Sequence, residues 1–314
     1  MAIQLVTGGA GFIGSHIATG LVERGKSVRV FDNLSTGKPS NISHLEGKIE
    51  FVKADLLDRS AVLNALKDVE VIYHQAALSS VPVSVARPLD SHNHCVTGTV
   101  NLLDVARQSG VRRVVFAGSS SVYGDQPFSS KREVDLTSPL SPYAAAKVAC
   151  EAYCLAFAAT YGLETVVLRY FNVFGPRQDP KSEYAAVIPK FVIAMMADEQ
   201  PTIFGDGLQA RDFTFVSNVV AANLAAADAE NVAGRVFNAA CGRQFTLLAL
   251  IDSINRILGK EIKPLFADPR PGDVRESLAD ITTAEEVLGY SPDVGFEEGL
   301  KQSIEYYKSV TARE

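Results

Sequence analysis

Tyr143 and Lys147 are the residues in this sequence whose types and spacing best suit proton transfer. Pro142 favours the first turn of a helix, and residues four apart share one helix face, so the two side chains are expected to be neighbours. A tyrosine phenol, with a reference pKa of about 10, is a poor base at neutral pH, but a nearby ammonium group favours the phenolate. The pair therefore predicts a base that takes a proton from an alcohol.

Hydroxyl groups for the same site follow a predicted strand. Residues 114–118 form a short apolar run typical of a buried parallel strand, and Ser119, Ser120 and Ser121 come directly after it. Open α/β sheets bind ligands at the carboxyl ends of their strands, so a serine here could bond the alcohol oxygen that Tyr143 deprotonates. A tyrosine four residues before a lysine is also common on protein surfaces, so this interpretation depends on the other motifs.

A glycine-rich loop at residues 7–14 predicts a dinucleotide site. It follows an N-terminal strand and opens a helix, whose backbone N–H groups and dipole face an anion. Gly8 and Gly11 allow a tight turn and the close approach of a pyrophosphate, and Gly14 lets the helix lie near the sheet. The alternative is that these glycines only tighten a turn.

Asp32 ends the second predicted strand, where a carboxylate accepts hydrogen bonds from an adenosine ribose. An acid at this position repels a 2′-phosphate, so NAD is favoured over NADP. The alternative is that Asp32 only caps a loop.

Strand-like and helical patterns alternate through the first half of the chain, which is the rhythm of a doubly wound parallel sheet. The expected strands are residues 3–7, 28–32, 49–53, 69–74, 114–118 and 165–170, and the expected helices are residues 11–24, 60–67, about 90–110 and 143–161. After residue 170 the rhythm breaks. We expect one further strand and three helices there, at residues 236–239, 246–258, 281–288 and 296–308.

The fold class is therefore α/β, a Rossmann-type doubly wound parallel sheet with a smaller C-terminal α+β substrate domain. We expect residues 1–174, with a returning segment near 212–243, to form the NAD-binding domain. Residues 175–211 and 244–314 are expected to form the substrate domain.

The composition argues against several other classes. The chain has 314 residues, of which 47% are hydrophobic and 21% charged, as in ordinary globular proteins. Its net charge is −6 and it has no basic tract, so a nucleic-acid partner has little support. No apolar run approaches the roughly 20 residues of a membrane helix. We also find no secretory leader, and we expect a cytoplasmic protein.

The four cysteines, at positions 95, 150, 154 and 241, include no CxxC pair. No other metal-type ligands surround them in the sequence. We interpret them as buried thiols in a reducing compartment and expect no metal site.

Taken together, these motifs resemble the extended short-chain dehydrogenase/reductase family. Within that family the sequence looks most like the UDP-hexose 4-epimerases, in particular bacterial UDP-N-acetylglucosamine 4-epimerases. The motifs that carry the resemblance span almost the whole chain: residues 8–14, 32–34, 55–56, 74–77, 119–124, 141–147, 169–175, 211–213 and 270–273.

The resemblance implies a role for each matching position. The catalytic group would be Ser119, Tyr143 and Lys147. The NAD site would comprise Gly8, Gly11, Phe12, Ile13, Gly14, Asp32, Asn33, Ser35, Gly37, Asp55, Leu56, Gln75, Ala76, Ala77, Tyr143, Lys147 and Tyr170. The UDP-sugar would contact Ser79, Ser119, Ser120, Ser121, Tyr143, Asn172, Ala186, Val187, Arg211, Arg270, Asp273 and Ser277. The helices near 90–110 and 143–161 would pair with those of a second copy into a four-helix bundle, giving a homodimer.

Two positions depart from galactose epimerases, which carry a lysine where this chain has Ser79 and an asparagine where it has Cys95. Dehydratases of the family place an acid pair where Ser120 and Ser121 stand, so dehydration is disfavoured. Ser277 falls where enzymes restricted to glucose and galactose place a tyrosine. The smaller serine leaves room for a 2-acetamido group. A UDP-hexuronic acid 4-epimerase, a sugar reductase and a non-catalytic NAD-binding protein remain as alternatives.

Overall fold

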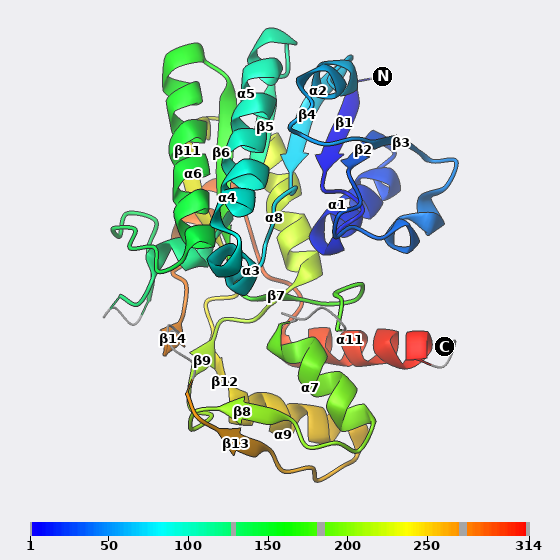
Figure 1. Ribbon diagram of the computed structural model, residues 1–314, viewed down its shortest axis with the longest axis vertical. Coiled ribbons are helices and arrows are strands. Elements are labelled where there is room, and N and C mark those ends of the chain that lie inside the picture. The colour runs from blue at the N-terminus through cyan, green and yellow to red at the C-terminus, as the bar shows by residue number, and fades with distance from the viewer. Residues whose placement is uncertain (1, 127–129, 181–185, 270–274, 312–314) are drawn as a thin grey trace.

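The computed structural model describes residues 2–126, 130–180, 186–269 and 275–311. Its upper part is a seven-stranded parallel sheet in the order β11-β6-β5-β4-β1-β2-β3 (Figure 1). The strands are β1 (Ile3–Thr7), β2 (Ser27–Asp32), β3 (Ile49–Lys53), β4 (Val69–His74), β5 (Arg113–Ser119), β6 (Glu164–Tyr170) and β11 (Arg235–Ala239). The predicted Rossmann-type fold is confirmed, and each expected strand lies within one residue of an observed one.

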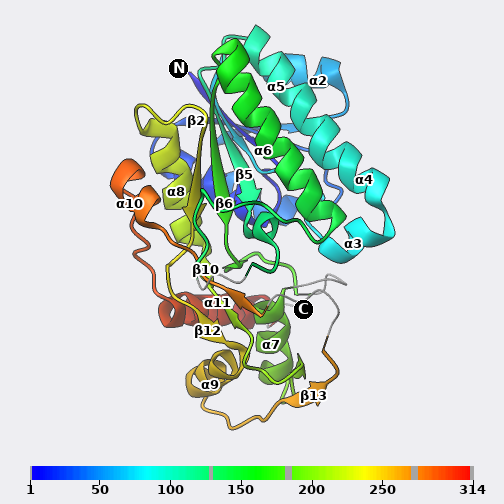
Figure 2. The same ribbon diagram turned by 90° about the vertical axis from the view of Figure 1, so that its left-hand side faces the viewer.

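Helices cover both faces of this sheet (Figure 2). One core cluster joins it to α1 (Phe12–Glu23), α8 (Val216–Asp228) and α10 (Thr282–Leu288). A second cluster joins the other face to α2 (Arg59–Ala65), α5 (Gly98–Gln108) and α6 (Pro142–Tyr161). Because both faces are covered, most side chains of the inner strands are buried, whereas the edge strand β3 is only partly covered.

The lower part is smaller and lies beyond the carboxyl ends of the strands (Figure 1). Its core is a third cluster in which Phe174, Phe213, Phe215 and Phe296 pack together. Its helices are α7 (Val187–Met196), α9 (Leu247–Leu258) and α11 (Phe296–Thr311). Its short strands are β7 (Val173–Phe174), β8 (Thr202–Phe204), β9 (Ala210–Arg211), β10 (Thr214–Phe215), β12 (Phe245–Thr246), β13 (Leu265–Ala267) and β14 (Glu276–Ser277).

Three helices were missed by the sequence analysis: α7, α8 and α3 (Val81–Ala86). Helix α8 carries few polar residues because it is packed between the sheet and α1, so it lacks the one-sided pattern of a surface helix. Helix α3 is rich in β-branched valine, but the Ser80 hydroxyl accepts the Val83 N–H at 3.3 Å and starts the helix.

The helix expected near 90–110 is interrupted. Helix α4 (Pro88–His92) leads into a π-helical turn at Asn93–Thr97, and α5 continues from Gly98. Gly98 lies against Leu56, since a Cβ added at Gly98 would be 3.2 Å from the Leu56 Cβ. The widened turn and the missing side chain bring this helix close to the loop after β3.

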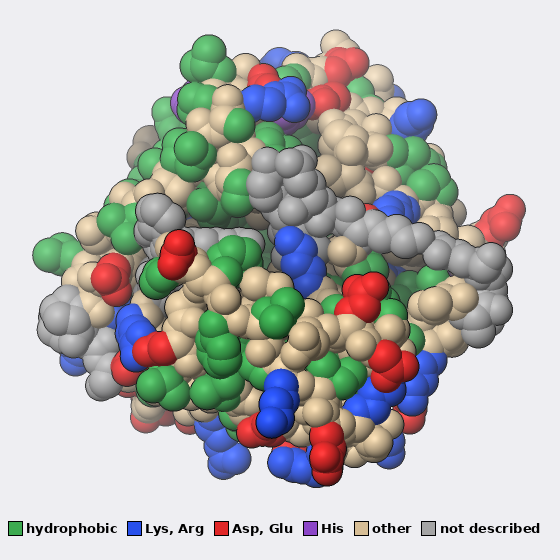
Figure 3. All heavy atoms as spheres, turned by 60° about the horizontal axis from the view of Figure 1, so that its bottom comes forward, with side chains coloured by type: hydrophobic (Ala, Val, Ile, Leu, Met, Phe, Trp, Pro, Cys, Tyr) green, Lys and Arg blue, Asp and Glu red, His purple; other side chains and the backbone are tan. Residues whose placement is uncertain are grey.

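Acidic and basic side chains are interspersed on the face formed by the lower part of the molecule (Figure 3). In the part of the chain that the structure describes, we find no helix long and apolar enough to cross a membrane.

Candidate active site

The glycine-rich loop connects β1 to α1 and lies against the end of β4. Gly8 has φ +64°, and a Cβ there would be 2.7 Å from the Ala76 backbone nitrogen. A Cβ on Gly14 would be 2.2 Å from the Gly8 carbonyl oxygen. Gly11 caps α1 without any side-chain hydrogen bond, so the backbone N–H groups of the first helical turn, including those of Phe12 and Ile13, remain for an anion. The glycine-rich loop and this first turn therefore form a cradle that fits a pyrophosphate.

Asp32, at the end of β2, is fixed beside that loop. Its Oδ2 accepts the Ala10 N–H at 3.0 Å and its Oδ1 accepts the Leu34 N–H at 2.8 Å. Gly37 lies so close that a Cβ there would be 2.8 Å from both carboxylate oxygens. A carboxylate has about four lone-pair directions, so two remain for the two hydroxyls of a ribose.

The next loop adds a second carboxylate. The Asn33 amide nitrogen donates to Asp55 Oδ2 at 2.8 Å, and Asn33 Oδ1 accepts the Ser35 N–H at 2.9 Å. Burial raises the pKa of Asp55, but hydrogen bonds from the Leu57 N–H and from Asn33 outweigh this and hold the pKa below its usual value. Leu56 beside it is buried. These residues form one continuous edge with Asp32.

A buried amide network lies where β4 and β6 end. The Gln75 amide donates to the Tyr170 hydroxyl at 3.0 Å, and the Asn223 amide donates to the same oxygen at 2.8 Å. Burial raises the pKa of Tyr170 well above its usual value, so Tyr170 is a neutral phenol. Ala76 and Ala77 pack beside it against the second core cluster. Asn223 was missed by the sequence analysis, because nothing local distinguishes it from Asn218, the other asparagine of the alanine-rich α8.

His74 fastens β4 to its neighbours. Its Nδ1 lies 2.7 Å from the Thr7 hydroxyl, and its Nε2 lies 2.9 Å from the Thr99 hydroxyl. Burial, with the Lys147 charge, lowers the pKa of His74 to about 3, so the ring is neutral. It therefore holds the strand ends in place as an uncharged ring with a single N–H at neutral pH.

Tyr143 and Lys147 lie on the first two turns of α6, as expected. The Lys147 ammonium is buried and donates to the Ala117 carbonyl at 2.7 Å, and it lies 5.8 Å from the centroid of the Tyr143 ring. Because Ala117 belongs to β5, this bond fixes α6 against the strand that ends at Ser119. The Tyr143 N–H in turn donates to the Ser84 hydroxyl of α3 at 3.0 Å.

Ser119 and Ser121 form a hydroxyl pair, with their Oγ atoms 2.8 Å apart. Ser119 also accepts the Ser121 N–H at 3.2 Å and so caps the 3-10 turn Ser120–Tyr123. The structure thus brings the serine run and the Tyr143–Lys147 pair to the same edge of the sheet.

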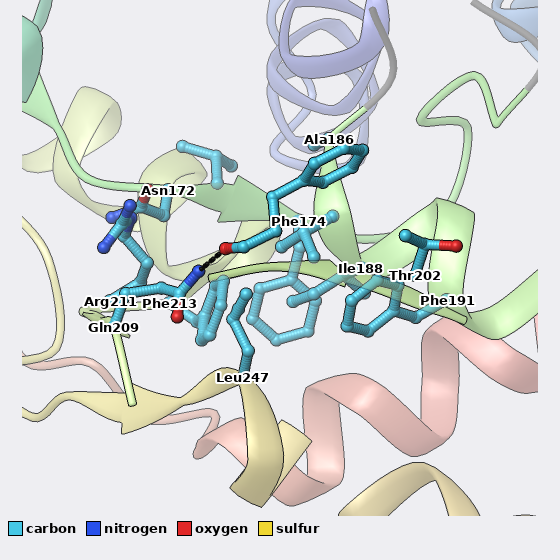
Figure 4. Close-up of a pocket in the computed structure, with 13 residues that line it drawn as sticks. Asn172, Phe174, Ala186, Ile188, Phe191, Thr202, Gln209, Arg211, Phe213 and Leu247 are labelled. Atoms are coloured by element: carbon cyan, nitrogen blue, oxygen red, sulfur yellow. Dashed lines mark hydrogen bonds between the residues drawn. The ribbon is translucent and has the colours of Figure 1, made fainter. Parts of the chain in front are cut away.

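A pocket of about 300 Å³ opens next to this edge, in the lower part of the molecule (Figure 4). Four of the predicted substrate residues line it: Asn172, Ala186, Val187 and Arg211. Asn172 and Arg211 lie at one end, and the rings of Phe174, Phe191 and Phe213 form much of the wall (Figure 4). Thus the pocket is apolar with a cationic end.

Ser277 lies beside the polar end of this pocket, on β14. It pairs with Arg211 of β9, and the Asn172 amide nitrogen lies 3.4 Å from the Ser277 hydroxyl. Asn172 has φ +34°, a conformation that L-residues rarely adopt, and its amide also donates to the Asp212 carbonyl at 3.2 Å. The three predicted residues Asn172, Arg211 and Ser277 are therefore held together.

Asp212 is a buried carboxylate that the sequence analysis did not single out as a site residue. It accepts N–H groups from Cys241 and Gly242 at 2.9 Å each and from Ala279 at 3.3 Å. Burial raises its pKa to about 6, although these hydrogen bonds act in the opposite direction. Asp212 ties the strand carrying Arg211 to the segment carrying Ser277.

Some predicted positions contribute less. Arg270 and Asp273 lie outside the described residues. Ser79 is exposed on the loop before α3. Cys95, Cys150 and Cys154 are buried as expected, whereas Cys241 is only half-buried. Among the residues with described positions, no group of three or more His, Cys, Asp or Glu side chains could hold a metal ion.

Comparison with known proteins agrees with this geometry. Residues 4–240 match the NAD dependent epimerase/dehydratase family, and the chain belongs to that family. The predictions of an enzyme of this class and of NAD as its cofactor are confirmed.

Several relatives match over nearly the whole chain. The UDP-glucose 4-epimerase of Mycolicibacterium smegmatis is 41% identical over 310 residues, covering 97% of this chain and 98% of that protein. The UDP-N-acetylglucosamine 4-epimerase of Methanobrevibacter ruminantium, solved with UDP-N-acetylmuramic acid, is 40% identical with a TM-score of 0.94, covering 98% and 99% of the two chains. The UDP-glucuronic acid 4-epimerase of Bacillus cereus, solved with a substrate analogue and NAD, is 32% identical with a TM-score of 0.92, covering 98% and 99%.

Replacing Gly14 by alanine should remove bound NAD, because the added Cβ would be 2.2 Å from the Gly8 carbonyl oxygen and would push the loop out of shape. The measurement is the nucleotide released by acid from the purified protein. Gly295→Ala is the matched control, since no atom lies within 4 Å of a Cβ at Gly295. If the Gly14→Ala protein has the same NAD content as the control, the assignment of the glycine-rich loop as the NAD site is wrong.

Proposed function

We propose that this protein is a UDP-sugar 4-epimerase that works through a 4-keto intermediate. The observation that carries the proposal is the bond from Lys147 on α6 to Ala117 on β5, two residues before Ser119. Through this bond the Tyr143 phenol, the Lys147 ammonium and the Ser119 hydroxyl lie at the same edge of the sheet, between the glycine-rich loop and the pocket. The 4-epimerase relatives add support.

In the proposed mechanism, Tyr143 as phenolate takes the proton of the sugar's C4 hydroxyl, and Ser119 bonds the same oxygen. Bound NAD supplies the acceptor for hydride from C4 and later its donor. Lys147 is buried, and its ammonium lies 5.8 Å from the centroid of the Tyr143 ring. After the keto sugar turns over in the site, Tyr143 returns the proton and the C4 configuration is inverted.

The cofactor contacts divide along the sheet edge. Asp32, Asn33, Ser35, Gly37, Asp55 and Leu56 would hold the adenosine half of NAD, and Gly8, Gly11, Phe12, Ile13 and Gly14 the pyrophosphate. The nicotinamide half would lie against Gln75, Ala76, Ala77, Tyr143, Lys147 and Tyr170. In this assignment, residues 1–174 with the segment near 212–243 form the NAD-binding domain.

The pocket suits the nucleotide of the substrate. Its aromatic and aliphatic wall fits a flat uracil, with Ala186 and Val187 beside the base. Arg211 at the polar end offers the donor fork that pairs with phosphates. Residues 175–211 and 244–314 would then form the nucleotide-sugar domain, in which Arg270 and Asp273 are assigned from the family resemblance alone.

A 2-acetamido sugar is the substrate we favour, on account of Ser277. Asn172 and Ser277 lie together beside Arg211, and a serine leaves more space there than a tyrosine would. The relative from Methanobrevibacter, named for UDP-N-acetylglucosamine, supports the same choice. A uronic acid is the competing substrate, and the Bacillus cereus relative is its support. Ser120 and Ser121 offer no acid pair for dehydration.

We further propose a homodimer built by α5 and α6. The exposed side of α6 carries Ala145, Ala152 and Ala156, whose small side chains allow another helix to approach closely, and Tyr153 is 43% exposed between them. Val85 and Leu89 on the neighbouring α3 and α4 are 63% and 77% exposed. An apolar strip of this kind is best covered by its own copy about a two-fold axis.

The first test is a panel of UDP-sugars incubated with the protein and no added cofactor. The wild type should interconvert C4 epimers, because hydride is removed and returned within one cycle. Tyr143→Phe should retain NAD but lose about 100- to 10,000-fold in rate, the usual loss for a general base. Net reduction that needs added NAD(P)H would instead indicate a reductase, and no turnover by an NAD-loaded protein would indicate a non-catalytic role.

Ser277→Tyr should remove activity on UDP-N-acetylglucosamine while affecting UDP-glucose much less, since steric exclusion acts on the larger substituent only. Initial rates are measured for both proteins on acetylated, plain and uronic UDP-sugars. The size argument is wrong if the wild type ignores the acetylated sugars or if the tyrosine variant accepts them at the parental rate.

Light scattering at micromolar concentration should give twice the mass of one chain. Tyr153→Glu, which places a charge in the apolar strip, should shift the mass toward the monomer. A monomeric wild type would exclude the four-helix bundle.

A further inference from the structure

We propose that Ser121 is a positioning residue that makes Ser119 a hydrogen-bond donor to the oxygen on C4. This inference rests on the proposed function and decides which of the three serines contacts that oxygen. Its basis is the pair of contacts at Ser119 Oγ: the Ser121 N–H at 3.2 Å and the Ser121 hydroxyl at 2.8 Å.

The argument begins with a count of protons and lone pairs. A serine hydroxyl has one proton to donate and two lone pairs that accept. The Ser121 N–H always occupies one lone pair of Ser119. If the Ser121 hydroxyl donates as well, the second lone pair is used, and the Ser119 proton is free for a ligand. If Ser119 donates to Ser121 instead, Ser119 has no proton left and can only accept.

The reaction selects between these two orientations. The oxygen on C4 is a hydroxyl in the substrate and a carbonyl in the intermediate, and a carbonyl oxygen has no proton. It therefore needs a donor, which Ser119 provides only when Ser121 donates to Ser119. As the C4–H bond breaks and its electron pair leaves as hydride, the hydroxyl proton passes to Tyr143. Ser119 keeps its own proton throughout.

The turn that carries the two serines is held rigidly. The Gly124 N–H donates to the Ser121 carbonyl at 3.3 Å, and a Cβ on Gly124 would be 1.9 Å from the Ser138 carbonyl oxygen. Tyr123 is buried, donates to the Asn238 side chain at 2.7 Å and packs 4.7 Å beneath the Arg169 guanidinium. Because these contacts hold the turn, the hydroxyl pair would be set before any sugar binds, which is the condition for an effective donor to a developing charge.

The test compares Ser121→Thr with Ser121→Val in the NAD-loaded enzyme. Threonine keeps the hydroxyl and valine has nearly the same shape without it, so their difference reports the hydroxyl alone. We expect Ser121→Val to lower kcat about tenfold, which corresponds to about 1.4 kcal/mol, with KM within about twofold. Ser121→Thr, which keeps the hydroxyl, should lose clearly less kcat than Ser121→Val. Bound NAD and Tm should be equal in the two variants.

A double-mutant cycle separates positioning from a structural role. Ser119→Ala should lower kcat about 100-fold or more, as expected for loss of a donor to a developing oxyanion. If Ser121 acts only through Ser119, then Ser119→Ala combined with Ser121→Val should be no slower than Ser119→Ala alone.

Additive losses, equal defects in the threonine and valine variants, a rise in KM alone, or no effect of valine would each overturn the role of Ser121. In those cases the wild type is active, and the proposed function stands. A wild type that turns over no UDP-sugar overturns both.

Discussion

The contact between the turn after β1 and the end of β4 is the constraint on which the rest of the site depends. Gly8 lies against the Ala76 backbone, and Gly14 lies against Gly8 itself, so neither position has space for a side chain. This packing draws the first turn of α1 onto the sheet edge, where Asp32 and Asp55 continue the same line. It also fixes where Gln75 and Ala77 emerge, because they follow β4 directly.

A second set of buried polar groups places the substrate side relative to that edge. Asp212 bonds three backbone N–H groups from two distant segments, and Glu151 on α6 pairs with the buried Arg169 on β6. Burying charges is costly unless each is paired, so these groups favour one arrangement of the segments over others. The pocket residues Asn172, Arg211 and Ser277 depend on Asp212 for their mutual position, and α6 depends on Arg169 for part of its docking.

The sheet and the reacting groups could be predicted because each has a local signal. Strands buried on both faces form apolar runs, the glycine spacing is specific, and Tyr143 and Lys147 are one helical turn apart. Asn223 and Asp212 could not be found in this way. Both act through partners more than 25 residues away in sequence, such as Tyr170 for Asn223 and Cys241 for Asp212. Residues 211–213 belong to a family motif, but that motif does not indicate which segments Asp212 bonds. Helix α8 was missed for a related reason, since burial on most of its surface removes the periodic pattern.

The place of β11 in the sheet affects how the chain can be made. This strand occupies the edge next to β6, but residues 173–228, including β7 to β10 and α8, come between them in sequence. During synthesis the first six strands leave the ribosome while β6 still has an open edge, and unpaired edges favour pairing with other chains. Strand β11 closes this edge, and it is synthesised only after the segment that carries Arg211. The upper sheet is therefore completed only after much of the lower part has been made.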